Sequence, residues 1–331
     1  MSRTAFILAL VLSLACVSWA QSSRNGMFQV EVEIHATAKK WPEGNSWKAT
    51  VYDSAGVLRY QIAKEIPYDV QYPAIRISDA GGRCIVFSPF EGWVEFYNGE
   101  GNIVGTMSPF IGEAPTYERI LKCSVAGERA AFLVSEPLTA SARVMLTDLE
   151  GNEIWNASFS LETAAEVFLS TNGDYVLAGS YSSGDRIERS TVLLDRRGNI
   201  LRTFDTIFRH ADFAEEDGRV VFTERNGIVI ASIDGKEASV RWSTKDRNEV
   251  VTGVRFAAGH VGVVVEKVTL ETGKPRYNNP QLVVLNQQGQ QVLNKQLHQI
   301  SEDPASLKID GETLTVSSGS AKLQVDVSKM E

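Results

Sequence analysis

The segment RHADF places His210 two residues before Asp212, at the predicted start of a strand. An imidazole beside a carboxylate could work as an acid–base pair or bind a metal ion. Such a pair more commonly forms structural hydrogen bonds at a strand end. The chain also lacks a Gly-x-Ser-x-Gly nucleophile turn, a zinc-ligand spacing and a Walker phosphate loop. We therefore assign no catalytic residue, no metal ligand and no cofactor.

Aromatic side chains on predicted loops form a second group of candidates. They are Trp41, Tyr68, Tyr72, Trp93, Tyr117, Phe208 and Tyr277. Aromatic residues on loops, framed by proline and charge, are typical of recognition surfaces. Their alternative role is to fill gaps between sheets. We predict these residues, together with His210, as the partner-binding set.

Two cysteines, Cys84 and Cys123, follow the N-terminal region. An even number of cysteines in an exported chain allows one disulfide between them. Two buried thiols that pack as small hydrophobic side chains are the favoured interpretation, and the disulfide is the alternative.

The N-terminal 20 residues have the layout of a secretory signal peptide. Arg3 precedes an apolar run over residues 5–17, and Ser18 and Ala20 supply the small residues of a cleavage site. The run is too short to span a bilayer, which takes about 20 apolar residues. We expect cleavage after Ala20 and a periplasmic or secreted mature protein. A lipid anchor at Cys16 is the lesser alternative, because Ser13 stands where lipoprotein signals usually have leucine.

The charge balance argues against nucleic acid as a partner. The chain has 33 basic and 41 acidic residues, and loss of residues 1–20 removes only Arg3, which leaves a net charge of −9. Nucleic-acid binding depends on a basic face. No second long apolar run follows residue 20, so we expect no membrane span.

One turn motif recurs along the chain. Asp or Asn is followed three residues later by Gly at Asp53/Gly56, Asn98/Gly101, Asp148/Gly151, Asp195/Gly198 and Asn286/Gly289. The side chain of the first residue accepts backbone hydrogen bonds, and the glycine adopts a positive φ. Each motif therefore predicts a type I turn with a glycine bulge that joins two antiparallel strands.

A second glycine turn precedes most copies of this motif, so one period contains four strands. The spacings from Gly82 to Gly127, Gly173 and Gly218 are 45, 46 and 45 residues. Valine, isoleucine, threonine and aromatic residues dominate the flanking runs. A four-stranded unit at this period is typical of a β-propeller, and we predict an all-β propeller as a single domain over residues 21–331. Seven blades are favoured over six by the mature length.

The repeats resemble those of the WD40-like, TolB-like and quinoprotein-like propeller superfamily. STNGDYVLAGS followed by VLLDRRGNILRTF is similar to the unit of its extracytoplasmic bacterial members. The chain lacks the Gly-His and Trp-Asp pairs of true WD40 blades, and only Trp155 and Trp242 stand where quinoprotein blades repeat a tryptophan. The resemblance implies the fold alone, because propellers carry many unrelated functions.

The strand order predicts two different faces. Tight turns between the first and second and between the third and fourth strands of each blade share one face, the turn face. Longer connections share the opposite face, the loop face, and include the predicted loop over residues 266–281. Binding concentrates on variable loops of rigid scaffolds. We expect a non-enzymatic module that docks a protein or a cell-envelope polymer on the loop face. The alternative is an extracytoplasmic hydrolase or lyase with its site at the channel mouth.

Overall fold

A computed structural model describes residues 16–24, 26–35, 45–66, 72–110, 119–136, 141–159, 161–182 and 187–330. Those residues form 28 strands and no helix. Accordingly, the described part of the chain has no helix that is long and apolar enough to cross a membrane. Contacts divide the chain into an N-terminal unit, Met1–Ala164, and a C-terminal unit, Ala165–Glu331.

The N-terminal unit contains three four-stranded antiparallel sheets, blades 1 to 3. Blade 1 consists of β1 (Cys16–Ser22), β2 (Phe28–His35), β3 (Asn45–Asp53) and β4 (Leu58–Ile66). Blade 2 consists of β5 (Ala74–Ile77), β6 (Cys84–Phe87), β7 (Val94–Tyr97) and β8 (Ile103–Met107). Blade 3 consists of β9 (Leu121–Ala126), β10 (Arg129–Glu136), β11 (Ser141–Asp148) and β12 (Glu153–Phe159).

The C-terminal unit contains four sheets, blades 4 to 7, and its first strand begins at the boundary. Blade 4 consists of β13 (Thr163–Leu169), β14 (Val176–Tyr181), β15 (Arg189–Leu194) and β16 (Ile200–Phe204). Blade 5 consists of β17 (Ala211–Ala214), β18 (Arg219–Glu224), β19 (Gly227–Ser232) and β20 (Val240–Ser243). Blade 6 consists of β21 (Glu249–Ala257), β22 (His260–Glu271), β23 (Lys274–Leu285) and β24 (Gln291–Gln296), with β25 (Ile300–Ser301) paired to β23. Blade 7 consists of β26 (Ser306–Asp310), β27 (Thr313–Ser318) and β28 (Ala321–Asp326).

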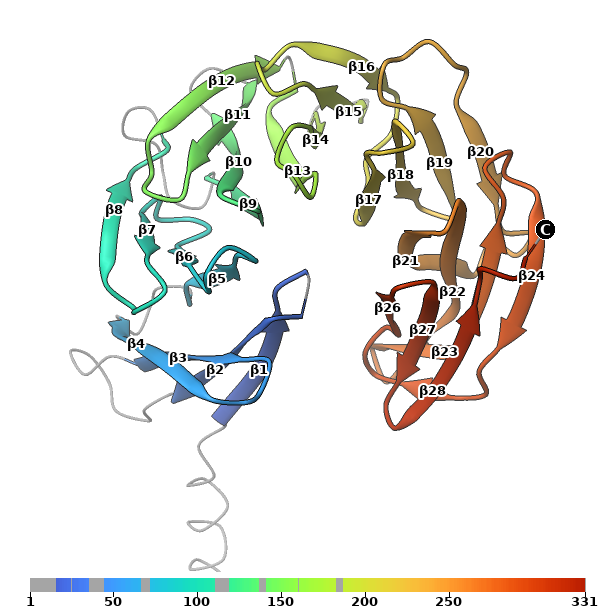
Figure 1. Cartoon of the computed structure of the whole chain (residues 1–331), viewed down its shortest axis with the longest axis horizontal. Helices are drawn as coiled ribbons and strands as arrows, with labels where there is room; N and C mark the ends of the chain where they lie inside the picture. The colour runs from blue at the N-terminus through green and yellow to red at the C-terminus, as the bar shows by residue number, and fades with distance from the viewer. Residues whose placement is uncertain are drawn as a thin grey trace, which may run out of the picture. The chain divides into compact units, whose positions relative to one another are not determined.

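Within each unit the blades follow one another in chain order, and in blades 1 to 6 the first strand lies on the inner side of the sheet and the fourth on its outer side (Figure 1). The fourth strands, such as β8 and β12, are largely exposed, whereas β10 and β14 are almost fully buried. The seven sheets confirm the predicted all-β propeller and the favoured blade number.

The turn of blade 4 shows why the recurring motif makes a hairpin. The Asp195 side chain accepts hydrogen bonds from the backbone N–H groups of Arg197 and Asn199, at 2.8 and 2.9 Å. Gly198 has a φ of 83°, and the register shifts by one residue between Leu193 and Leu194. These features are the predicted type I turn and bulge. The same hydrogen bonds recur at Asp53, Asn98, Asp148 and Asn286.

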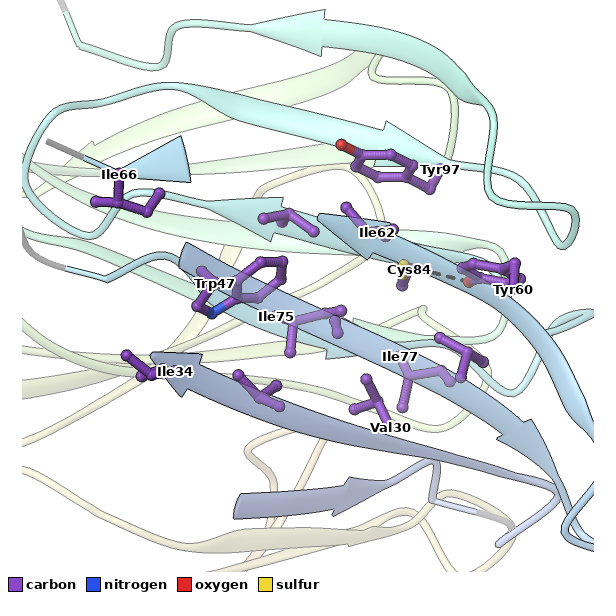
Figure 2. Close-up of a cluster of buried hydrophobic side chains, with 14 residues drawn as sticks. Val30, Ile34, Trp47, Tyr60, Ile62, Ile66, Ile75, Ile77, Cys84 and Tyr97 are labelled. Atoms are coloured by element: carbon purple, nitrogen blue, oxygen red, sulfur yellow. Dashed lines mark hydrogen bonds between the residues drawn. The ribbon is translucent and has the colours of Figure 1, made fainter. Parts of the chain in front are cut away.

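Apolar side chains of neighbouring blades form the core. In the N-terminal unit, Trp47 and Ile75 are fully buried in a cluster that joins blades 1 and 2 (Figure 2). The hydroxyl of Tyr60 lies 2.5 Å from the carbonyl oxygen of Gly82 and 3.2 Å from Cys84 Sγ, so blade 1 also contacts blade 2 through polar groups. Burial of such side chains supplies the main stabilisation of each unit.

One predicted loop of blade 6 is a pair of strands. Residues 266–281 continue β22 and β23, which pair from Glu271/Lys274 to Val261/Leu285. Thr272 and Gly273, with φ values of 51° and 82°, form the connecting turn. The expectation of a long loop here was wrong, because the threonine–glycine pair closes a two-residue hairpin and the flanking residues pair across it.

Candidate functional site

The predicted partner-binding residues divide into those within and those outside the described part of the chain. Trp41, Tyr68 and Tyr117 lie outside it. Tyr72 and Trp93 belong to the N-terminal unit, and Phe208, His210 and Tyr277 belong to the C-terminal unit. The described members of the set are therefore divided between the two units, two in the first and three in the second.

Trp93 and Tyr72 both pack against the cluster that joins blades 1 and 2, and both are half-buried. The Trp93 indole N–H donates a hydrogen bond to Glu91 Oε2 over 3.0 Å. Lys64 Nζ lies 4.9 Å from the centre of the indole and 2.5 Å from Glu95 Oε2. Trp93 thus takes part in packing and in a cation–π contact between blades.

Phe208 belongs to the core. Its side chain is 2% exposed, and its ring lies 6.3 Å from that of Phe222. A ring this deeply buried cannot contact a partner, so the structure does not support its place in the binding set. A Cβ atom added at Gly179 would lie 3.3 Å from the Phe208 ring, so the ring packs closely against the backbone of β14.

His210 is exposed, but Asp212 does not pair with it as a catalytic dyad would require. Asp212 Oδ2 accepts a hydrogen bond from the backbone N–H of Phe256, 2.9 Å away in the next blade. Desolvation by the surrounding protein lowers the pKa of His210, and the guanidinium groups of Arg255 and Arg209 lower it further. Among the residues that the structure describes, no three His, Cys, Asp or Glu side chains come together as metal ligands.

Tyr277 lies on β23, where it pairs with Val268 of β22 and with Ser301 of β25. Its side chain is half-buried. Tyr277 therefore lies on a strand and not on a flexible connection.

Cys84 and Cys123 are free, buried thiols, so the possible disulfide between them is not formed. They belong to different core clusters, the first between blades 1 and 2 and the second between blades 2 and 3. Burial raises the pKa of each thiol to about 12, although the hydroxyl of Tyr60 opposes the shift at Cys84 and Arg76 opposes it at Cys123. Both cysteines pack as small apolar side chains, which is the interpretation that the sequence favoured.

A depression of about 620 Å³ opens on the turn face of the C-terminal unit, and we call it the inner depression. It is lined by the turns after β13, β17 and β21 and by one residue of β26, so all four blades of the unit contribute. The lining residues are 171–172, 213–217, 256–259 and Ile309.

Aromatic and aliphatic side chains form the floor of the inner depression. Phe213 stacks on Phe168 and on Tyr175, with ring centres 6.2 Å apart in each case. Phe256 is half-buried, and the hydrogen bond that its backbone N–H donates to Asp212 fixes its backbone. Ile309 is 41% exposed, so its side chain adds accessible apolar surface to the hollow.

Carboxylates form one side of the rim. Glu215 Oε1 accepts a hydrogen bond from the backbone N–H of Asn172 over 3.1 Å, which links the turns of blades 4 and 5. Glu216 and Asp217 are exposed and make no ion pair with a described residue. None of the lining residues is lysine, arginine or histidine.

A smaller groove of about 440 Å³ lies farther out between blades 4 and 5. Tyr175 lines it, together with Asp174, Asp234, Arg196 and Arg197. Its charges are mixed, and Asp195, also in its lining, already binds the backbone of its own turn. The inner depression is therefore the better candidate site.

The sequence contains a pattern that marks the inner depression, although the predicted binding set lies on the loop face. Phe213, Phe256 and Ile309 occupy the same position in three repeats, as the third residue of ADF, VRF and LKI. Each stands just before a tight turn, at the turn face. Large apolar residues at the turn-face ends of three first strands can line a hollow there as well as form core.

No protein-family model matches this chain. No curated protein matches it either. Solved structures do: the structure of the Dos1 propeller matches with a TM-score of 0.60 and 12% identity, over 92% of this chain and 76% of that one. The crystal structure of Saccharomyces cerevisiae Sqt1 matches with a TM-score of 0.56 and 10% identity, over 90% of this chain and 80% of that one. The chain has a WD40-like β-propeller fold. At these identities the likeness shows the fold alone.

Proposed function

We propose that this chain is an exported, non-enzymatic propeller that docks a protein partner in the inner depression. One observation carries the proposal: Phe256 and the 41%-exposed Ile309 line a hollow to which four blades contribute. Binding sites are concave, largely apolar and bounded by a few polar groups. The WD40-like fold suits a protein-interaction scaffold, which supports a protein as the occupant. A cell-envelope polymer is the other occupant that the sequence led us to expect.

Export rests on the signal peptide predicted for residues 1–20. Cleavage after Ala20 would remove five of the seven residues of β1 and leave β2 as the first full strand of blade 1. Mass spectrometry of the protein from its producing cell tests this, and we expect Gln21 at the mature N-terminus. A chain that begins at a lipid-modified Cys16, or one that keeps residue 1, would contradict it.

Docking is tested by crosslinking in the producing cell. Ile309→Asp places a charge in the hollow and should abolish capture of the partner, because apolar contact is lost and a carboxylate is desolvated. Leu270→Asp is the matched control, since Leu270 is 77% exposed on the β22–β23 hairpin, outside the depression. Equal capture by both variants would contradict docking at this site. Capture of a glycan instead of a protein would identify the polymer as the occupant.

A further inference from the structure

The rim of the inner depression carries two carboxylates, Glu216 and Asp217, that form no ion pair with a described residue. Glu215 holds the blade 4 turn through Asn172, but Glu216 and Asp217 project as exposed carboxylates beside the apolar floor. No cationic residue lines the hollow. Two unneutralised carboxylates at one edge make a local negative potential that favours a cationic ligand group over a neutral one.

We infer that the docked partner presents a basic segment, in which a lysine or arginine pairs with Glu216 and Asp217 while a neighbouring apolar side chain covers Phe256 and Ile309. This inference rests on the proposed function and names the chemistry of its partner.

The floor favours the same kind of segment. Phe256 is half-buried and therefore keeps part of its ring accessible, and an arginine or lysine can lay its methylene stem along a ring while its charge reaches the rim. Ile309 is aliphatic and 41% exposed, so an apolar side chain of the partner can cover it without burying an unpaired polar group. A segment that alternates cationic and apolar residues satisfies both surfaces at once.

Other classes of ligand fit less well. Nucleic acid and anionic lipid present phosphates, which the rim would repel. A calcium ion needs six to eight oxygen ligands, and two exposed carboxylates supply too few. The observations therefore favour a basic protein segment.

A displayed library of random peptides, selected on the full chain, tests the inference. Three proteins serve as targets: wild type, the rim variant Glu216→Lys/Asp217→Lys and the floor variant Ile309→Asp. A fourth, Glu100→Lys/Glu128→Lys, changes the net charge equally at exposed turns of blades 2 and 3. Enriched peptides are synthesised, and their dissociation constants are measured by calorimetry at low and physiological salt.

We expect enrichment of peptides with lysine or arginine next to leucine, isoleucine, valine or phenylalanine. Their affinity should fall by about tenfold or more on the rim variant, stay unchanged on the charge control and weaken with salt. Enriched peptides that are neutral or acidic, or that bind the rim variant equally well, would overturn the basic-segment inference while loss on the floor variant keeps the proposed docking site. No enrichment, or enrichment insensitive to Ile309→Asp, would overturn the docking site itself.

Discussion

Glu266 Oε2 of blade 6 accepts a hydrogen bond from the backbone N–H of Ala305, 2.9 Å away at the start of blade 7. Thr252 donates a second hydrogen bond to the same oxygen over 2.6 Å, while Oε1 is buried without a partner among the described residues. In the N-terminal unit Ser135 makes the equivalent bond, accepting from the backbone N–H of Ala164. Five other blades have serine or threonine at this buried position: Ser88, Ser135, Ser180, Thr223 and Ser318. Blade 6 thus has a carboxyl group where five of the other blades have a hydroxyl.

Glu266→Gln should reduce the dependence of stability on pH. Burial raises the pKa of Glu266, although the bonds from Thr252 and Ala305 oppose the shift. A carboxyl with a raised folded-state pKa contributes stability below its unfolded pKa of about 4.3 and loses it as pH rises through the folded value. Relative to wild type, the variant should therefore lose less unfolding free energy as the pH rises from acidic to weakly alkaline values.

Urea unfolding at several pH values measures this difference. Glu249→Gln is the control, because Glu249 is half-buried in the neighbouring strand and accepts a hydrogen bond from Gln281. A difference between Glu266→Gln and wild type that stays constant with pH would contradict the raised pKa.

Gly105→Ala should destabilise the N-terminal unit by about 2 kcal/mol or more. A Cβ at Gly105 on β8 would lie 1.8 Å from the carbonyl oxygen of Glu150, so the backbones of blades 2 and 3 would have to separate. Thr106→Ala, at the next and exposed position of the same strand, should have little effect. Thermal unfolding of both variants makes the comparison, and equal melting temperatures would show that the two blades separate at little cost.

The variant Trp93→Ala tests whether the Trp93 ring stabilises the fold or binds a partner on the loop face. Because the indole packs on the cluster of blades 1 and 2 and lies under Lys64, its loss should cost about 2 to 3 kcal/mol in unfolding free energy. Trp93→Phe should retain much of that stability. If Trp93→Ala unfolds like wild type but no longer captures the partner, the ring belongs to a binding surface on the loop face.

Ala258→Asn should stabilise the C-terminal unit by about 0.5 to 1 kcal/mol. Ala258 has a φ of 45° in the two-residue turn between β21 and β22, followed by Gly259 with a φ of 74°. Asparagine tolerates this left-handed conformation better than alanine and is favoured before glycine in such hairpins. Thr272→Asn introduces asparagine at the corresponding position of the turn between β22 and β23 and should also raise the unfolding free energy. A fall in melting temperature for both variants would contradict this account.

Arg255→Gln should raise the pKa of His210. Desolvation and the charges of Arg255 and Arg209 all lower that pKa, and the substitution removes one of the three causes. Because a depressed histidine pKa opposes protonation of the folded state, wild type should lose stability as pH falls below about 6.5, and the variant should lose less. NMR titration of the imidazole C–H signals measures the pKa, with Arg276→Gln on the β22–β23 hairpin as the control. An unchanged or lower pKa in Arg255→Gln would contradict the assigned cause.

Local features of this fold could be predicted from the sequence, and features that join distant segments could not. The Asp195 turn forms from five consecutive residues, so its motif alone specifies it. The extension of β22 and β23 was missed because Thr272–Gly273 is a weaker turn signal than Asn–Gly and charged residues surround it. The inner depression combines residues from Thr171 to Ile309, and its shape depends on how four blades pack. Burial of Phe208 likewise depends on Phe222, in a strand that follows in the next blade.

The state of Cys84 and Cys123 has a practical consequence for work on this protein. Because both sulfurs are unbonded and enclosed in the apolar interior, neither of these two cysteines needs oxidation, and we expect recombinant material to fold in a reducing cytosol. The same seclusion makes these thiols slow toward maleimides. In a chain with Cys16 replaced by serine, a single cysteine introduced on the surface could therefore carry a fluorophore with little background labelling.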